Sequence, residues 1–147
     1  MSDGPVLICF DGSASARRAI TAAAELLGPR RAVVLDVGPP VTRAESYAAM
    51  SAIPIDLFEE ENAADALVRA REGGELARTA GFEAEARAMV AAPTWQGIVD
   101  AATELDVDVI VMGSRGLTGI REALDGSISH QVAEHAGRPV LIVPAPE

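Results

Sequence analysis

The sequence predicts an α/β protein built on a doubly wound parallel sheet. Short apolar runs alternate with patterns of helical spacing from one end of the chain to the other, which is typical of this fold class. The runs are apolar at consecutive positions, as in strands buried on both faces. With 49% hydrophobic but only 3% aromatic residues, the core must consist of alanine, valine, isoleucine and leucine. The length of 147 residues fits one domain, so we expect residues 1–147 to form a single unit.

The first part of the chain contains two predicted strands around one helix. The first strand is expected at Val6–Phe10, a continuous apolar run. Ser13 is a candidate N-cap of the following helix, because a serine hydroxyl accepts a hydrogen bond from a free N–H of the first turn. Gly28-Pro29 ends that helix, and Ala32–Val37 is the second strand.

A long connection follows, from Gly38 to Pro54, which contains three prolines and is expected to be mobile. The capping-box pattern Asp56–Glu59 then predicts the start of a helix that runs to Ala80. Gly73-Gly74 lies inside this helix, where each glycine should cost about 1 kcal/mol relative to alanine. No sequence feature explains the presence of these two glycines.

The second part of the chain continues the alternation. Pro93-Thr94 is expected to open a helix with an apolar inner face, and Gly137 followed by Pro139 should end the last helix. The remaining strands are predicted at Phe82–Val90, Val107–Met112 and Val140–Val143, and the last helix at Ser127–Ala136.

Charge excludes several function classes. The formal net charge of −10 argues against a nucleic-acid-binding surface, although it leaves room for a nucleotide in one local pocket. The chain has no lysine at all. It therefore lacks the lysine that a Walker A loop requires, and lysine Schiff-base chemistry is excluded as well.

Cys9 is the only cysteine, which excludes a disulfide framework and a cysteine metal cluster. Within the first apolar run it is expected to be a small buried residue, not a nucleophile. Apolar runs of about five residues are too short to span a membrane, and no signal-peptide pattern is found. A cytoplasmic location is expected.

The most informative stretch ends at Ser127. An apolar strand leads into the pattern Gly113-x-x-Gly116, then nine residues, then Gly126-Ser127 at the start of the last predicted helix. In open α/β sheets, ligands bind at the carboxyl ends of the strands, where helix N-termini present free N–H groups. Glycines there let the backbone approach a phosphate. The pattern predicts a phosphate-bearing ligand held mainly by backbone groups.

With this motif the chain resembles the universal stress protein family, in the branch that binds nucleotides. The resemblance covers nearly the whole chain. The segments that carry it are Ile8–Ser13, Val34–Val37, Asp108–Gly116, Gly126-Ser127 and Arg138–Pro144. The resemblance implies an open five-stranded parallel sheet in the order 3-2-1-4-5, with a pocket for ATP or a related adenine nucleotide.

The resemblance also implies the site residues by position. Asp11 would face the adenosine end of the nucleotide. Val37 and Met112 would contact adenine, and Gly113 would lie near the ribose. The residues that would hold the phosphates are Gly116, Gly126, Ser127 and Ile128. The alternative is that Asp11 only helps Ser13 to cap the first helix and that the glycines only form turns.

The phosphates would need positive charge. A helix N-terminus at Ser127 supplies about half a unit charge, and Arg115 is the nearest candidate cation, with Arg121 behind it. A divalent ion, Mg²⁺ or Mn²⁺, would be carried by the phosphates, because the sequence shows no side-chain cage for one. Asp125 departs from the family, which often has an apolar or small residue there. That carboxylate would be unfavourable beside a phosphate unless it points to water or helps to hold the metal.

These observations predict an adenine-nucleotide-binding regulator or sensor in the stress response. Catalytic residues are not predicted, because His130 lies one turn after Ser127 without a third residue to orient it. The alternatives are a slow ATP hydrolase, a protein that binds AMP or cAMP, and a nucleotide-free dimeric scaffold. Family members commonly dimerise through the last strand, so a homodimer through Val140–Val143 is expected, with neither nucleic acid nor membrane as a partner.

Overall fold

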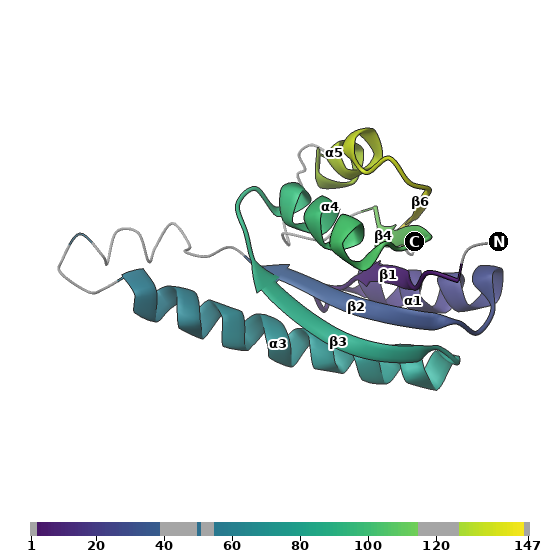
Figure 1. Cartoon of the computed structure of the whole chain (residues 1–147). Helices are drawn as coiled ribbons and strands as arrows, with labels where there is room; N and C mark the ends of the chain where they lie inside the picture. Colours follow the sequence, from purple (N-terminus) through teal and green to yellow (C-terminus); the bar gives the residue numbers. More distant parts are fainter. Residues whose placement is uncertain (1–2, 39–49, 51–54, 115–126, 146–147) are drawn as a thin grey trace.

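Five parallel strands form one sheet in the order β3-β2-β1-β4-β6, as Figure 1 shows. The computed structural model describes residues 3–38, 50, 55–114 and 127–145. The strands are β1 (Val6–Cys9), β2 (Arg31–Gly38), β3 (Glu83–Val90), β4 (Val109–Gly113) and β6 (Val140–Val143). Because β6 is the fifth of these strands along the chain, the predicted order 3-2-1-4-5 is confirmed.

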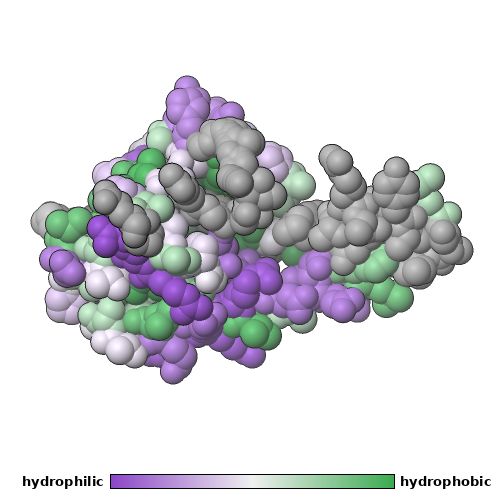
Figure 2. All heavy atoms as spheres, turned by 180° about the vertical axis from the view of Figure 1, so that it is seen from behind, coloured by the Kyte–Doolittle hydropathy of each residue, from purple (hydrophilic) through white to green (hydrophobic). Residues whose placement is uncertain are grey.

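Helices cover both faces of the sheet, which makes it doubly wound (Figure 1). The described helices are α1 (Ala14–Leu27), α3 (Ile55–Ala80), α4 (Thr94–Leu105) and α5 (Ser127–His135). Helices α1 and α3 pack on one face, and α4 and α5 pack on the other. Seen from the side of α1 and α3, hydrophilic side chains extend over much of the lower part of the molecule (Figure 2).

Strand β1 lies in the centre of the sheet and supplies both cores. Val6 and Ile8 pack toward Ile20 of α1. Leu7 and Cys9 alternate with them and belong to the core beneath α4 and α5. All four β1 residues are at most 2% exposed, so the continuous apolar run reflects burial on both faces, as predicted.

Helix α1 begins and ends where the sequence predicts. The Oγ of Ser13 accepts a hydrogen bond from the N–H of Ala16 at 3.1 Å, which confirms Ser13 as the N-cap. Gly28 ends the helix with φ of 69°, and its N–H donates to the carbonyl oxygen of Ala24 at 3.1 Å. This left-handed conformation suits glycine because it has no Cβ.

The paired glycines of α3 have different environments. A Cβ on Gly73 would lie 2.7 Å from the ring of Phe10 and 2.8 Å from Val34, so only glycine lets α3 approach the sheet there. A Cβ on Gly74 would find its nearest neighbour at 3.5 Å, an ordinary contact distance. Close packing therefore explains Gly73, which the sequence alone does not.

The predicted start of α3 is wrong. The helix already begins at Ile55, so Asp56 lies in its first turn and Glu59 just after it, and Asp56 is not the N-cap of a capping box. Acidic residues are favourable in a first turn because the helix dipole is positive at its N-terminus. Most of the Gly38–Pro54 connection lies outside the described residues, so its mobility stays a prediction.

Candidate functional site

The carboxyl ends of β1, β2 and β4 lie along one edge of the sheet because the strands are parallel. The chain continues from β1 to β2 and β3 on one side, while β4 and β6 lie on the other side. The strand order thus reverses beside β1, and ligands of open α/β sheets bind at such switch points. Helix α5 connects two parallel strands and so begins at this same edge. The topology places Asp11, Gly113 and Ser127 at the same edge of the sheet.

Asp11 lies in a tight turn just after β1. Its Oδ1 accepts a hydrogen bond from the N–H of Ser13 at 2.9 Å, and Gly12 between them has φ of 86°. Asp11 therefore orients the N-cap residue without bonding to the helix itself. Burial raises the pKa of the Asp11 carboxyl, while the hydrogen bonds from Ser13 and the charge of Arg69 act in the opposite direction.

Gly113 ends β4 directly against the start of α1. A Cβ at this position would collide with Oγ of Ser15 and lie 3.0 Å from the Ser15 carbonyl oxygen. The Ser15 hydroxyl is buried and has no hydrogen-bond partner within the described part of the chain. Gly113 is therefore required for packing, whether or not it also lies near a ribose.

Val37 and Met112 have different degrees of exposure. Val37 is half-buried near the end of β2 and lies next to Gly97 of α4. Met112 is fully buried in the core beneath α4 and α5, so its side chain has no surface to offer a ligand. A contact between Met112 and adenine would have to involve its backbone.

The predicted phosphate side of the site is only partly described. Ser127 is the first residue of α5, and Ile128 is half-buried against the core beneath α4 and α5. Arg115, Gly116 and Gly126 lie outside the described residues. Their predicted contacts with phosphate stay predictions.

An ion pair that the sequence analysis missed lies at the same edge. Asp36 of β2 has a side chain only 3% exposed, and its carboxylate accepts two hydrogen bonds from Arg69 of α3. The distances are 2.7 Å from Nε to Oδ2 and 3.3 Å from Nη2 to Oδ1. Burial raises the pKa of Asp36, and the bonds from Arg69 act against this rise. A single aspartate inside the apolar run of β2 was the available signal, because a buried charge needs a partner.

Cys9, His130 and Glu134 carry potentially reactive side chains, but their surroundings do not indicate a catalytic or metal site. Cys9 is buried, and burial together with nearby carboxylates raises its pKa to about 12, so the thiol is unreactive at neutral pH. His130 and Glu134 form an exposed pair at 3.3 Å on α5. The described ranges contain no group of three or more His, Cys, Asp or Glu side chains that could hold a metal ion.

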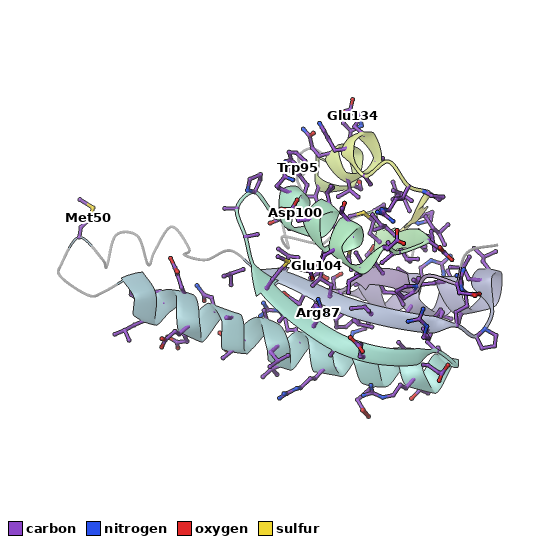
Figure 3. The ribbon with its side chains drawn as sticks, viewed as in Figure 1. Met50, Arg87, Trp95, Asp100, Glu104 and Glu134 are labelled. Carbon is purple, nitrogen blue, oxygen red and sulfur yellow. The ribbon has the colours of Figure 1, made fainter. Side chains whose placement is uncertain are left out.

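Helices α4 and α5 are joined by an aromatic contact. Trp95, near the start of α4, stacks on His135 with ring centroids 4.6 Å apart, and Figure 3 shows Trp95 beside α5. Nδ1 of His135 lies 2.9 Å from the carbonyl oxygen of Gln131 in the last turn of α5, as expected for a histidine at a helix C-terminus. Nearby, Arg87 of β3 pairs with Glu104 of α4 at 2.9 Å (Figure 3).

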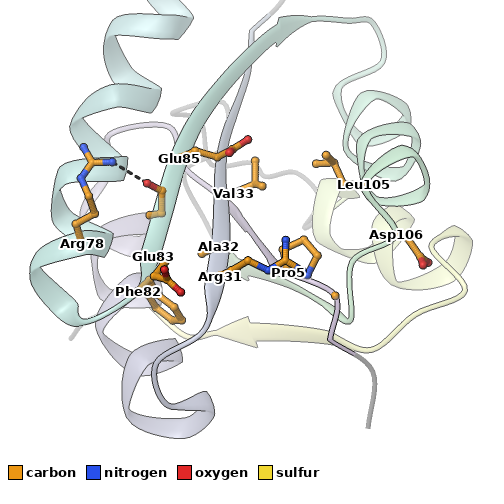
Figure 4. A pocket seen from close by; sticks show the side chains of 12 residues that line it. Pro5, Arg31, Ala32, Val33, Arg78, Phe82, Glu83, Glu85, Leu105 and Asp106 are labelled. Carbon is orange, nitrogen blue, oxygen red and sulfur yellow. Dashed lines mark hydrogen bonds between the residues drawn. The ribbon is translucent and has the colours of Figure 1, made fainter.

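A groove of about 820 Å³ lies at the opposite, amino edge of the sheet (Figure 4). Its lining mixes Arg31 and Arg78 with Glu83, Glu85 and Asp106. Helices α3 and α4 both end beside it, and helix C-termini are negative. This charge distribution makes the groove a poor phosphate site compared with the carboxyl edge.

The parallel sheet with helices on both faces defines the class of open, doubly wound α/β proteins, and sequence comparison identifies the family. The model of the universal stress protein family matches residues 4–144. The universal stress protein YxiE of Bacillus subtilis is 33% identical over 144 residues, which cover 94% of this chain and 97% of YxiE. The chain belongs to the universal stress protein family.

Solved structures support the same assignment of fold. The structure of the hypothetical protein MJ0577 of Methanocaldococcus jannaschii superposes with a TM-score of 0.77 at 23% identity, covering 100% of this chain and 99% of that one. A universal stress protein in complex with cAMP superposes with a TM-score of 0.64 at 28% identity, covering 99% and 100%. Within the ranges that the structure describes, no helix has the length and apolar character needed to cross a membrane.

Proposed function

We propose that this universal stress protein binds an adenine nucleotide, with ATP as the principal ligand, and acts as a nucleotide-dependent regulator or sensor in the stress response. One observation carries the proposal: Asp11, Val37 and Gly113 lie at the ends of three neighbouring strands where α5 begins. This edge offers the carboxylate of Asp11, the apolar side chain of Val37 and the N-terminus of α5. An adenine nucleotide has matching ribose hydroxyls, a purine ring and phosphates.

The charges at this edge favour one orientation of the nucleotide. The end formed by β1 and β2 holds the carboxylates of Asp11 and Asp36, with Arg69 paired to Asp36, so it suits uncharged ribose and adenine. The N-terminus of α5 at Ser127 is positive and suits phosphate. We therefore place the nucleoside at β1 and β2 and the phosphates toward Gly116, Gly126 and Ser127.

A cyclic or monophosphate nucleotide is the second candidate. A universal stress protein with 28% identity to this chain has been solved with cAMP, and its fold matches over nearly the whole chain. The site proposed here does not depend on the number of phosphates, because the ribose and adenine contacts are the same. A divalent cation would be carried by the phosphates of ATP.

The same site supports binding more than catalysis. Of the two histidines, His130 lies one turn after Ser127 in an exposed pair with Glu134, and His135 lies in the last turn of α5. A general base for water attack would have to lie within hydrogen-bond reach of the γ-phosphate. We therefore propose that the protein hydrolyses ATP slowly at most. We also propose that it acts in the cytoplasm as a homodimer joined through Val140–Val143.

The test is to denature freshly purified protein and identify any released nucleotide by mass spectrometry, followed by calorimetric titration with ATP, AMP and cAMP. We expect a stoichiometric adenine nucleotide or a micromolar Kd, which is about −8 kcal/mol. Gly126→Val should abolish binding, whereas Gly74→Ala, far from the predicted phosphate loop, should not. No released nucleotide and no binding heat at millimolar ligand would support the nucleotide-free scaffold instead.

A further inference from the structure

The Asp36–Arg69 pair lies beside the proposed nucleoside end and has no part in the phosphate motif. Asp36 is near the end of β2, and Arg69 reaches it from α3. A Cβ on Gly12 would lie 3.9 Å from Cδ of Arg69, and a Cβ on Gly38 would lie 3.6 Å from its Nη2. The guanidinium thus lies across the gap between the ends of β1 and β2, next to the turn that holds Asp11.

We propose that the Asp36–Arg69 pair is a positioning element of the nucleotide site, in which Asp36 fixes Arg69 beside Asp11 so that Asp11 can bind ribose hydroxyls as an ionised carboxylate. The inference rests on the function proposed above. It assigns to Arg69 a role at the nucleoside end that does not require contact with the phosphates.

Arg69 carries a positive charge that acts on both carboxylates near the ends of β1 and β2. Asp11 and Asp36 are both partly buried there, and the charge of Asp11 makes ionisation of Asp36 harder. Arg69 opposes this effect for both, since its charge lowers the pKa of Asp11 and its hydrogen bonds lower that of Asp36. An ionised carboxylate accepts stronger hydrogen bonds from hydroxyl groups than a protonated one.

The fixed geometry distinguishes Arg69 from the other charges near Asp11. Arg17 of α1 reaches the Gly12 carbonyl oxygen at 3.4 Å and bonds Glu72 at 2.6 Å, but the Glu72 side chain is 48% exposed, whereas the Asp36 side chain that holds Arg69 is 3% exposed. Asp65, which lies on the same helix as Arg69, raises the pKa of Arg69 through its negative charge. Of these groups only Arg69 is held by a buried carboxylate, so it keeps one position when the ligand enters.

The experiment compares ATP and AMP affinities of the wild type and Arg69→Gln by calorimetry between pH 5 and 8. We expect both nucleotides to bind Arg69→Gln up to about tenfold more weakly at pH values where Asp11 is protonated in the variant but still ionised in the wild type, the contribution of one charge-assisted hydrogen bond. The pH at which affinity is lost should move upward, because Asp11 protonates more readily without the cation. Arg69→Lys keeps the charge and should restore both the affinity and the pH profile.

Two controls separate this role from a structural one. In an Asp11→Asn background, Arg69→Gln should cause no further loss of affinity, because no carboxylate is left to keep ionised. If Arg69→Gln fails to fold with Asp36 unpaired, the double variant Asp36→Asn/Arg69→Gln removes the buried charge, and we expect the same direction of change. An equal loss in both Asp11 backgrounds, or an unchanged pH profile, would overturn the inference.

The outcomes also separate this inference from the proposed function. A loss for ATP that is much greater than the loss for AMP would show that Arg69 contacts the phosphates, which contradicts the positioning role and leaves nucleotide binding intact. If the wild type binds neither nucleotide at millimolar concentration, the proposed function fails and the inference fails with it.

Discussion

Gly73 and Gly113 show how single residues set the distance between a helix and the sheet. Gly73 lets α3 rest on Phe10 and Val34, and Gly113 lets the first turn of α1 lie against the end of β4. Each position would require a shift of neighbouring atoms if a methyl group were added. A glycine of the predicted nucleotide-binding motif can therefore be needed for packing, whether or not it also meets a ligand.

Gly73→Ala should destabilise the protein by about 1–3 kcal/mol, as is typical of overpacked cores. Gly74→Ala is the matched control, because its methyl group fits at ordinary contact distances and alanine favours a helix by up to about 1 kcal/mol. The measurement is the free energy of unfolding in urea. Equal effects at the two positions would contradict the packing argument.

Asp11→Asn should stabilise the folded protein at pH 7 while weakening nucleotide binding. The pKa of Asp11 is raised above its ordinary value of 3.8 in the folded protein, mainly by burial. Its contribution to stability is therefore greatest below pH 3.8 and is lost as the pH rises through the raised folded pKa. Asparagine can still accept the hydrogen bond from Ser13.

The measurement is urea unfolding of wild type and Asp11→Asn from pH 3.5 to 7 without ligand. The difference in free energy of unfolding should grow in favour of the variant as the pH rises. A variant that is less stable than the wild type at pH 7 would contradict the prediction, because it would show that the ionised carboxylate of Asp11 stabilises the folded protein.

At the residue scale, sequence reasoning found the positions that have local signatures and missed those created by tertiary contacts. Ser13 was identified as an N-cap because capping depends on the residues next to it. The partner of Asp36 was missed because Arg69 is 33 residues away, and only the packing of α3 on β2 brings the two together. Gly73 was noticed but unexplained for the same reason.

At the scale of elements, β6 is the strand at the edge of the described sheet, next to β4. Ile142 on this strand is 39% exposed although it is a large apolar residue. An exposed apolar edge strand favours pairing with another chain. This agrees with the proposed homodimer through Val140–Val143.

Ile142→Lys should convert the proposed dimer to a monomer, because edge lysines oppose strand pairing between chains. Leu26→Lys on α1 is the control, since Leu26 is even more exposed, at 68%, but does not lie on the edge strand. Light scattering after size-exclusion chromatography gives the mass of each variant. A wild type that is monomeric, or an Ile142→Lys variant that stays dimeric, would exclude this interface.

Element boundaries were predicted less well than element types. The alternation of apolar runs and helical patterns identified the five strands of the sheet. Burial on both faces leaves a clear pattern in β1 and β4, whereas β3 was found from its alternating residues. The start of α3 was misplaced, since acidic residues suit both an N-cap and a first turn. Family resemblance supplied the strand order, which the alternation alone does not determine.

At the scale of the whole molecule, a ligand that binds only the folded state must stabilise it. At a ligand concentration of about 100 Kd, the free energy of unfolding should rise by about 2.7 kcal/mol. Thermal unfolding with and without ATP measures this shift, and Gly126→Val should show none. A shift of equal size in the variant would indicate binding outside the glycine motif.

The most direct test of the central claim is an NMR titration of the uniformly ¹⁵N-labelled protein with ATP. The account predicts shifts of amide signals at the carboxyl edge, in Asp11–Ser13, Val37-Gly38, Gly113-Ser114 and Ser127-Ile128. The amide signals at the amino-edge groove, near Gly4, Phe82 and Asp106, should not move. Shifts confined to that groove, or no shifts at millimolar ATP, would contradict a nucleotide site at the carboxyl edge of the sheet.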